Sequence, residues 1–412
     1  MKLFHKVNSL PSQSTQHKYK LRAILSGHRG AVACLAVHPL GTYVSSGGDY
    51  GTYIWHLATS QSIRAPAGPG DRGATTALVW MTRSNDSDDG LAFGTENGYL
   101  CVWKRSQTEE WREVFCRRLN GGEDGQEIVG IAYDAGSAQL AVVHRSQVVH
   151  RFLMNSSMHP NSLSSKSISN HWPQSVGFGQ TDARGPEIWS IGREDGVIHI
   201  LNVNGTIIQS WPTETIIGHA VINIKEDALI LDDVAQGVVL FKISGLERVR
   251  TFAVPSRERR SRNVAFHDSG NTLISGSDHG VIYLFDRRTG DVVDTIYMGV
   301  KDWVQSVVTT ELDNIPTIIL GQSGDNTGEG QIQVWQKQST PAVDVTRRSS
   351  LLEQTSWVLC ALLTSLFVLE HILDLPMTNL KQFVDWVMIL LKNFRVNAIQ
   401  ENELVIEDLD YI

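Results

Sequence analysis

The sequence predicts an all-β fold, a propeller of seven four-stranded antiparallel blades, followed by a C-terminal helical tail. Short runs of β-forming residues alternate with turn clusters of Gly, Asn, Asp and Ser along most of the chain. A strand that follows a turn glycine and ends in a large apolar residue recurs four times, and three degenerate copies bring the number to seven. Its spacing of 40 to 50 residues is typical of propeller blades. The closing residues are Trp55, Trp103, Phe152, Leu201, Phe241, Phe285 and Trp335.

The clearest blade begins at residue 263. We expect its strands at residues 263–266, 272–275, 281–285 and 292–297, with turns at residues 267–271 and 277–280. The turns contain Gly, which tolerates positive φ, and Asp, Asn and Ser, which hydrogen-bond their own backbone. A four-stranded sheet with two apolar faces is not stable alone. Each blade must therefore stack on its neighbours.

The chain begins with a polar segment, residues 1–17, which we expect to be a flexible arm, and the propeller is expected over residues 18–337. The seventh blade shows no fourth strand after Trp335. We therefore expect residues 19–24 to complete it and to close the ring. Two polar stretches have little apolar content: residues 82–90, interpreted as a long solvated turn, and residues 154–169, interpreted as a surface insertion.

Beyond the propeller, the sequence indicates a polar linker at residues 338–354, an apolar segment at residues 355–396 and an acidic tail at residues 397–412. The apolar segment permits two interpretations. Its first run is at the short end of the length that spans a bilayer. If this run is a span, the basic residues that precede it would leave the propeller on the cytosolic side of the membrane. Alternatively, two amphipathic helices form a hairpin that turns near Pro376 and packs on itself, on the propeller or on a membrane surface.

Two blades carry residues that resemble a known family. In the first blade these are Gly27-His28, Ser45, Asp49 and Trp55, and in the sixth they are Ser275-Gly276-Ser277-Asp278-His279-Gly280 with Leu284-Phe285-Asp286. This pattern resembles the WD-repeat (beta-transducin-like) family over about residues 19–337. The resemblance implies a seven-bladed propeller. It also implies that His28, Ser45, Asp49 and Trp55 form a structural hydrogen-bond relay.

Composition restricts the classes of function. The net charge of −8 over 412 residues argues against a general nucleic-acid binder. The four cysteines have no Cys-x-x-Cys spacing, so neither a disulfide framework nor a zinc site is expected. The first residues lack the apolar core of a signal peptide, which indicates a cytoplasmic or nuclear protein. No cofactor is predicted.

The sequence does not predict an enzyme. It contains no phosphate-binding glycine loop, no Gly-x-Ser-x-Gly and no histidine pair at metal spacing. His28, Ser45 and Asp49 have the residue types of a catalytic triad, but the resemblance assigns them to the relay. We therefore expect a protein-interaction scaffold, and the alternative is a membrane-attached adaptor that uses residues 355–396.

The four strands of a blade are called a to d from the inside outward. In the family that this chain resembles, the d–a loops between blades and the b–c loops within blades surround one end of the central channel, and this face is the expected binding surface. Arginine and tryptophan are the residue types enriched at binding hot spots, and the basic loop at residues 256–262 suggests an acidic or phosphorylated protein or peptide partner. The other interpretation is that the tryptophans lie on blade flanks and the arginines are merely solvated. The candidate residues are Arg257, Arg259, Arg260, Arg262, Trp172, Trp303, Arg193, Asp278 and His279.

Overall fold

The computed structural model describes residues 17–338, apart from residues 67–70, 84–85, 107–109, 120–126, 183–184, 300, 325–327 and 329. The chain divides into two compact units, Met1–Gln338 and Ser339–Ile412, and the described residues belong to the first. The interpretations of residues 355–396 as a membrane span or a helical hairpin lie outside the described residues. Within the described part of the chain, no helix is long and apolar enough to cross a membrane.

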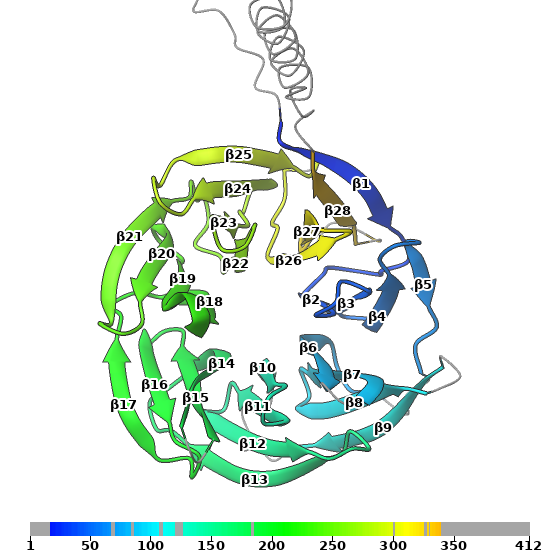
Figure 1. Cartoon of the computed structure of the whole chain (residues 1–412), viewed down its shortest axis with the longest axis vertical. Helices are drawn as coiled ribbons and strands as arrows, with labels where there is room; N and C mark the ends of the chain where they lie inside the picture. Colours follow the sequence, from blue (N-terminus) through cyan, green and yellow to red (C-terminus); the bar gives the residue numbers. More distant parts are fainter. Residues whose placement is uncertain are drawn as a thin grey trace, which may run out of the picture. The chain divides into compact units, whose positions relative to one another are not determined.

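Seven four-stranded antiparallel sheets form a ring, which confirms the predicted propeller (Figure 1). In blades 1 to 6 the first strand is innermost and the last is outermost (Figure 1). Blades 1 to 3 are β2(Cys34–Val37) to β5(Gln61–Ile63), β6(Thr75–Arg83) to β9(Trp111–Arg118), and β10(Ile128–Asp134) to β13(Pro160–Ser167). Blades 4 to 6 are β14(Pro173–Asp182) to β17(Ile207–Pro212), β18(Ile217–Asn223) to β21(Glu247–Ala253), and β22(Val264–His267) to β25(Val292–Tyr297).

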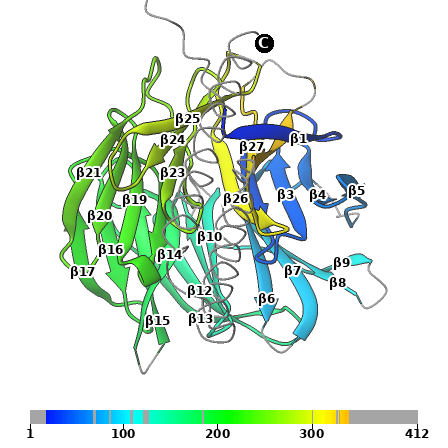
Figure 2. The same ribbon diagram turned by 45° about the horizontal axis from the view of Figure 1, so that its top comes forward.

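The strands between these are β3(Tyr43–Gly48), β4(Gly51–His56), β7(Asp86–Thr95), β8(Tyr99–Arg105), β11(Gln139–His144), β12(Val148–Met154), β15(Gly185–Gly192), β16(Val197–Leu201), β19(Ala228–Asp233), β20(Gly237–Lys242), β23(Thr272–Ser275) and β24(Val281–Asp286). A short 3-10 helix, η1(Ile224–Glu226), connects β18 to β19. Figure 2 shows neighbouring blades side by side, with β14 toward the channel and β17 and β21 outside.

The seventh blade closes the ring with strands from both ends of the propeller, as the sequence predicts. It contains β26(Ser306–Leu312), β27(Ile315–Gly321), β28(Ile332–Lys337) and the N-terminal β1(Tyr19–Leu25). Strand β1 lies beside β28 in Figure 1. The two strands pair antiparallel, with Tyr19 opposite Lys337. This pairing satisfies backbone groups that would otherwise form an open sheet edge.

The turn glycines explain why the hairpins recur. Gly98, Gly196 and Gly280 stand just before the third strands of their blades and have φ of 78°, 60° and 81°. This left-handed region is costly for residues with a Cβ, so glycine is favoured in the tight turn.

The hydrophobic core lies between adjacent blades. The closing residues Trp55 and Phe285, for example, are each 1% exposed. Trp55 packs in a cluster with Leu25 of β1, Val44 of blade 1 and Ile319 of blade 7. Each interface therefore buries the face of one sheet against the next, and the blades stabilise one another.

The interpretations of the two polar stretches were wrong. Within residues 154–169, β13 is the outermost strand of blade 3 and pairs with β12. Its side chains are mostly exposed, so an outer strand is defined by backbone pairing and needs few apolar residues. Within residues 82–90, β6 and β7 extend the hairpin as far as the Arg83–Asp86 pair.

Candidate functional site

All seven blades contribute to one cavity of about 540 Å³ at the centre of the ring, which we call the channel mouth. Its wall is formed by the innermost strands, by the loops that precede them and by the turns after the second strands of blades 3 and 4. The lining residues that bear on binding are Glu127, Arg145, Gln174, Ser175, Arg193, Arg259, Arg260, Asn263, Trp303 and Gln305. These side chains come from blades that are far apart in the sequence, so only ring closure brings them together.

The channel mouth is cationic although the protein is acidic overall. Four arginines line it, and the acidic residue among its lining is Glu127, which pairs with Arg145 at 2.6 Å. Arg260 pairs with Glu258 at 2.6 Å, outside the lining. The local excess of guanidinium groups attracts anions, because a guanidinium binds carboxylate and phosphate oxygens with two parallel hydrogen bonds.

Arg260 and Trp303 form a structured pair at the rim. The Arg260 guanidinium lies 5.2 Å from the centre of the Trp303 ring, within the range of a cation–π contact. The Trp303 indole nitrogen donates to the Ser261 carbonyl at 3.0 Å. Both side chains remain partly exposed. The pair therefore has a fixed direction while it still faces the solvent.

The basic loop is fixed at its start by an acidic side chain from the next blade. Asp278, in the turn after β23, accepts hydrogen bonds from the backbone nitrogens of Arg257 and Glu258 and from the Ser256 hydroxyl. Burial raises the pKa of Asp278, but the bonds from Glu258, His279 and Arg257 outweigh it and hold the pKa below its ordinary value. Asp278 is thus a loop anchor. The sequence predicts Asp278 as a partner-binding residue, whereas in the structure its side chain is 2% exposed.

The prediction for Arg262 was wrong, because this side chain is 1% exposed and pairs inside the protein. Its guanidinium donates to Asp232 Oδ1 at 2.9 Å through Nε and to the Asp233 carbonyl at 2.7 Å. Its backbone nitrogen donates to Asp232 Oδ2 at 2.7 Å. Burial raises the pKa of Asp232 to about 6, against the lowering by Arg262. A charged residue in a loop can be structural when a neighbouring blade supplies its counter-ion.

The remaining predicted binding residues do not line the channel mouth. Arg257 is exposed but does not line the cavity. Trp172 is 39% exposed, and its carbonyl accepts from the backbone nitrogen of Arg193 at 2.8 Å. His279 is held by Asp278 at 2.8 Å and by the Tyr283 hydroxyl at 3.0 Å. The structure therefore brings together Arg193, Arg259, Arg260 and Trp303 out of the nine predicted residues.

Two polar groups in the channel mouth were not predicted. Ser175 is 6% exposed, and its hydroxyl has no hydrogen-bond partner among the described residues. The side-chain oxygen of Gln174 is also buried without a partner there. Buried polar atoms without partners are uncommon, because leaving one unpaired costs free energy. Both lie on β14 at the cavity wall, and Ser175 can offer a hydrogen bond to a bound group.

The predicted relay of blade 1 is not formed, because Ser45, Asp49 and Trp55 make no hydrogen bond to His28 or to one another. His28 is buried, and its Nδ1 lies 2.8 Å from the hydroxyl of Ser46. The Ser45 hydroxyl donates to the Ala36 carbonyl at 3.3 Å, because adjacent residues of a strand point to opposite faces. Asp49 is exposed, and the Trp55 indole nitrogen donates to the Ser26 carbonyl at 3.0 Å. Burial lowers the pKa of His28.

A more complete relay lies in blade 4. His171 is fully buried, with Nδ1 2.7 Å from Asp195 and Nε2 2.8 Å from the Ser190 hydroxyl. We missed His171 because asparagine precedes it instead of the usual glycine. Its spacing to Ser190 was the available signal, since His28 and Ser46 are separated by a similar interval.

Two clusters have metal-binding residue types, namely His171 with Asp195 and His199, and Cys101 with Glu113 and Cys116. Both nitrogens of His171 are already bonded within the relay. In the second cluster, Arg72 donates two hydrogen bonds to the Glu113 carboxylate. A cation would have to displace these partners, so neither cluster is a preformed metal site.

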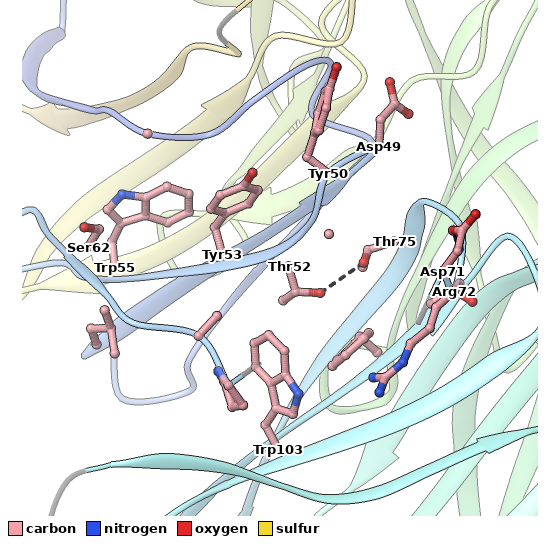
Figure 3. Close-up of a pocket in the computed structure, with 18 of the residues that line it drawn as sticks. Asp49, Tyr50, Thr52, Tyr53, Trp55, Ser62, Asp71, Arg72, Thr75 and Trp103 are labelled. Carbon is pink, nitrogen blue, oxygen red and sulfur yellow. Dashed lines mark hydrogen bonds between the residues drawn. The ribbon is translucent and has the colours of Figure 1, made fainter. Parts of the chain in front are cut away.

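A second cavity of about 620 Å³ lies between blades 1 and 2 (Figure 3). Tyr53 and Trp55 form one wall and Trp103 faces them, with Arg72 at the side. The hydroxyls of Thr52 and Thr75 are 3.0 Å apart and connect the two blades. None of the predicted partner-binding residues lines this groove. The channel mouth is therefore the stronger candidate site.

Comparison with known proteins matches the two blades whose sequence carries the motif most clearly. The family model described as "WD domain, G-beta repeat" matches residues 19–56 and 258–286. The chain is 37% identical over 81 residues to "Ribosome biogenesis protein erb1" of Pyrenophora tritici-repentis (strain Pt-1C-BFP). This similarity covers 19% of the chain and 10% of that protein, so the chain spans about a tenth of the length of the curated relative it matches.

Proposed function

Because this chain is a WD-repeat β-propeller, we propose that it is a non-catalytic intracellular scaffold that binds an acidic or phosphorylated protein segment at the channel mouth. The observation that carries this proposal is the gathering of Arg193, Arg259 and Arg260 with Trp303 in one cavity of an acidic protein. We propose the cytoplasm or nucleus as its location.

The geometry supports an extended segment with an acidic or phosphorylated side chain. Arg193 and Arg259 line the cavity from different parts of the ring, and each guanidinium can bind an anionic group there. The Ser175 hydroxyl, which has no partner among the described residues, also lines the cavity and can donate to such a group. Trp303, held by Ser261 and Arg260, offers a rigid apolar surface beside the charge, an arrangement typical of binding hot spots.

A non-catalytic role is supported by how the acid and base side chains are used. The His171–Asp195–Ser190 relay and the Asp232–Arg262 pair have the residue types of catalytic groups. Their hydrogen bonds are made inside the blades, and none of these five residues lines the channel mouth. The polar groups that do face the cavity are suited to binding an anion.

The relative erb1 suggests one setting in which to look for the partner. Its name refers to ribosome biogenesis, but the similarity covers only 10% of that protein. WD repeats share motif residues that support the fold, so similarity of this extent does not carry a function with it. Pre-ribosomal fractions are therefore one of the samples for the capture experiment.

The test is capture of partners by the full chain and by two triple variants with the same change of charge. The first variant replaces Arg193, Arg259 and Arg260 of the channel mouth with Ser. The control replaces three exposed arginines elsewhere with Ser, namely Arg112, Arg117 and Arg288. At low and at moderate salt, we expect the first variant to lose proteins that the wild type and the control retain. Capture by the wild type and the control should itself weaken as the salt concentration rises.

Phosphatase treatment of the lysate distinguishes the two kinds of anionic partner. Loss of capture after treatment indicates a phosphorylated segment, and unchanged capture indicates carboxylates. The proposal is wrong if the channel-mouth variant retains the same partners as the control at low salt while both variants melt like the wild type.

A further inference from the structure

Blade 2 contains a pair of thiols on its two outer strands. Cys101 of β8 and Cys116 of β9 stand directly opposite each other in the antiparallel register. Their sulfur atoms are 3.0 Å apart, and both cysteines are free thiols in the structure. Opposed residues on neighbouring strands have Cα separations that a disulfide can span. The backbone therefore already holds the two sulfurs where a bond between them can form.

The two thiols differ in their accessibility. Cys101 is fully buried, whereas Cys116 is partly exposed. Burial, followed by the hydrogen bond with Cys116, raises the pKa of the Cys101 thiol, although the charge of Arg72 opposes this. A reagent in solution therefore meets Cys116 first, and Cys101 is placed to react with whatever forms there.

Arg72 connects this pair to the groove between blades 1 and 2. Its NH1 group donates to the Cys101 sulfur at 3.3 Å, and its guanidinium also holds the Glu113 carboxylate. Figure 3 shows Arg72 and Trp103 together at the groove. The Arg72 charge opposes the rise in the pKa of Cys101, whereas the Glu113 carboxylate adds to that rise.

From this geometry we infer that Cys101 and Cys116 are an oxidisable dithiol, which hydrogen peroxide converts reversibly into an intramolecular disulfide between the third and fourth strands of blade 2. The inference is independent of what binds at the channel mouth. The pair uses a different blade surface and a different chemistry.

The reaction has two steps. The Cys116 thiolate attacks one oxygen of hydrogen peroxide, the O–O bond breaks, and the departing hydroxide takes up a proton to become water. Cys116 is then a sulfenic acid. The Cys101 sulfur attacks the Cys116 sulfur and gives up its proton, and the S–O bond breaks with release of a second water. Two thiols are oxidised and one peroxide is reduced, and a dithiol reductant reverses the change.

The test uses the full-length protein, treated with hydrogen peroxide and digested with trypsin without reduction. Basic residues lie between the two cysteines, so they fall in different peptides. We expect a peptide that contains Cys101 linked to one that contains Cys116, with the loss of two hydrogens, and its disappearance after dithiothreitol. The oxidised protein should also melt roughly 5 °C higher, because the link constrains the unfolded chain.

Cys116→Ser should abolish the linked peptide, and Cys34→Ser should leave it unchanged, as a matched control outside the pair. The wild-type protein alone also decides the question if Cys116→Ser does not fold. Sulfinic acid on Cys116 with Cys101 still a free thiol would overturn the inference. So would one equivalent of zinc that protects both thiols from alkylation, since that outcome indicates a metal site.

Discussion

The hydroxyl of Tyr19 lies 2.8 Å from Nε2 of His267, and 248 residues separate the two in the chain. Tyr19 begins the strand that completes blade 7, and His267 ends the innermost strand of blade 6. Burial lowers the pKa of His267 to about 4, so the ring is neutral at pH 7 and Nε2 can accept from the hydroxyl. This bond ties the closing strand to a second blade in addition to its pairing with β28.

Replacing Tyr19 with Phe tests the contribution of this bond. Tyr19 is 5% exposed, so the variant leaves Nε2 of His267 buried without a partner. We expect the free energy of unfolding to fall by about 1–2 kcal/mol. Tyr50→Phe, at a residue that is 66% exposed, is the control and should change it little. Urea denaturation measures both, and equal stability of the two variants would contradict the role of the bond.

Two N-terminal truncations test ring closure. Removing residues 1–25 takes away β1 and leaves β28 as an open edge with an uncovered apolar face. We expect the melting temperature to fall by roughly 10 °C or more, or the protein to aggregate. Removing residues 1–16 leaves β1 in place and should change the melting temperature little. If the two truncations melt alike, the pairing does not stabilise the ring.

Breaking the buried Arg262–Asp232 pair should be strongly destabilising. Replacing Arg262 with Ala leaves the Asp232 carboxylate, which is 0% exposed, without its counter-ion. We expect a loss of about 3–5 kcal/mol in the free energy of unfolding. Arg257→Ala, in the same loop but exposed, is the matched control and should cost little. Denaturation curves measure both variants. Similar midpoints for the two would mean that Arg262 does not form a buried pair with Asp232.

Buried histidines predict a loss of stability in mild acid. Burial lowers the pKa of both His150 and His267 to about 4, from 6.5 in the unfolded chain. Between pH 6.5 and pH 4 the unfolded state binds more protons than the folded state. The stability that each neutral, buried histidine contributes is therefore complete above pH 6.5 and is lost as the pH falls toward 4. Each histidine adds a slope of up to about 1.4 kcal/mol per pH unit.

The contribution of one histidine is separated by substitution. His150→Gln should give a shallower fall in the free energy of unfolding between pH 6.5 and 4.5, relative to the wild type. Above pH 7 the two proteins should differ by a constant amount. Parallel curves across the whole range would mean that His150 is protonated in the folded protein at the same pH as in the unfolded chain.

Blade number and strand positions could be predicted because they depend on local signals. The turn glycines such as Gly280 and the closing residues such as Phe285 repeat with the blades, and each acts within its own hairpin. The closing strand was predictable by elimination, since blade 7 lacked a partner for β28. Strand β13 was missed, because an outermost strand buries few side chains and carries little apolar periodicity.

The binding site could be predicted only in part. The basic loop at residues 256–262 was visible in the sequence, and so was its place next to a first strand. The sequence does not show which of its arginines face the solvent. Arg262 turns inward to Asp232 of the preceding blade, while Arg260 stacks on Trp303 of the following one. Ser46, His171 and Arg145 were missed because their roles depend on partners that other strands or other blades supply.

The number of blades, the hairpins within them and the acidic charge of the whole protein can be read from the sequence, because they follow from periodicity, turn chemistry and composition. Tertiary structure alone decided which charges are buried and which face the channel, because that depends on the counter-ion that a neighbouring blade presents. The same loop therefore contains Arg262, fixed within the fold, and Arg259, free to line the cavity. The pairing of β8 with β9 also places Cys101 opposite Cys116. Strand register, and not sequence spacing, brings their two sulfurs together.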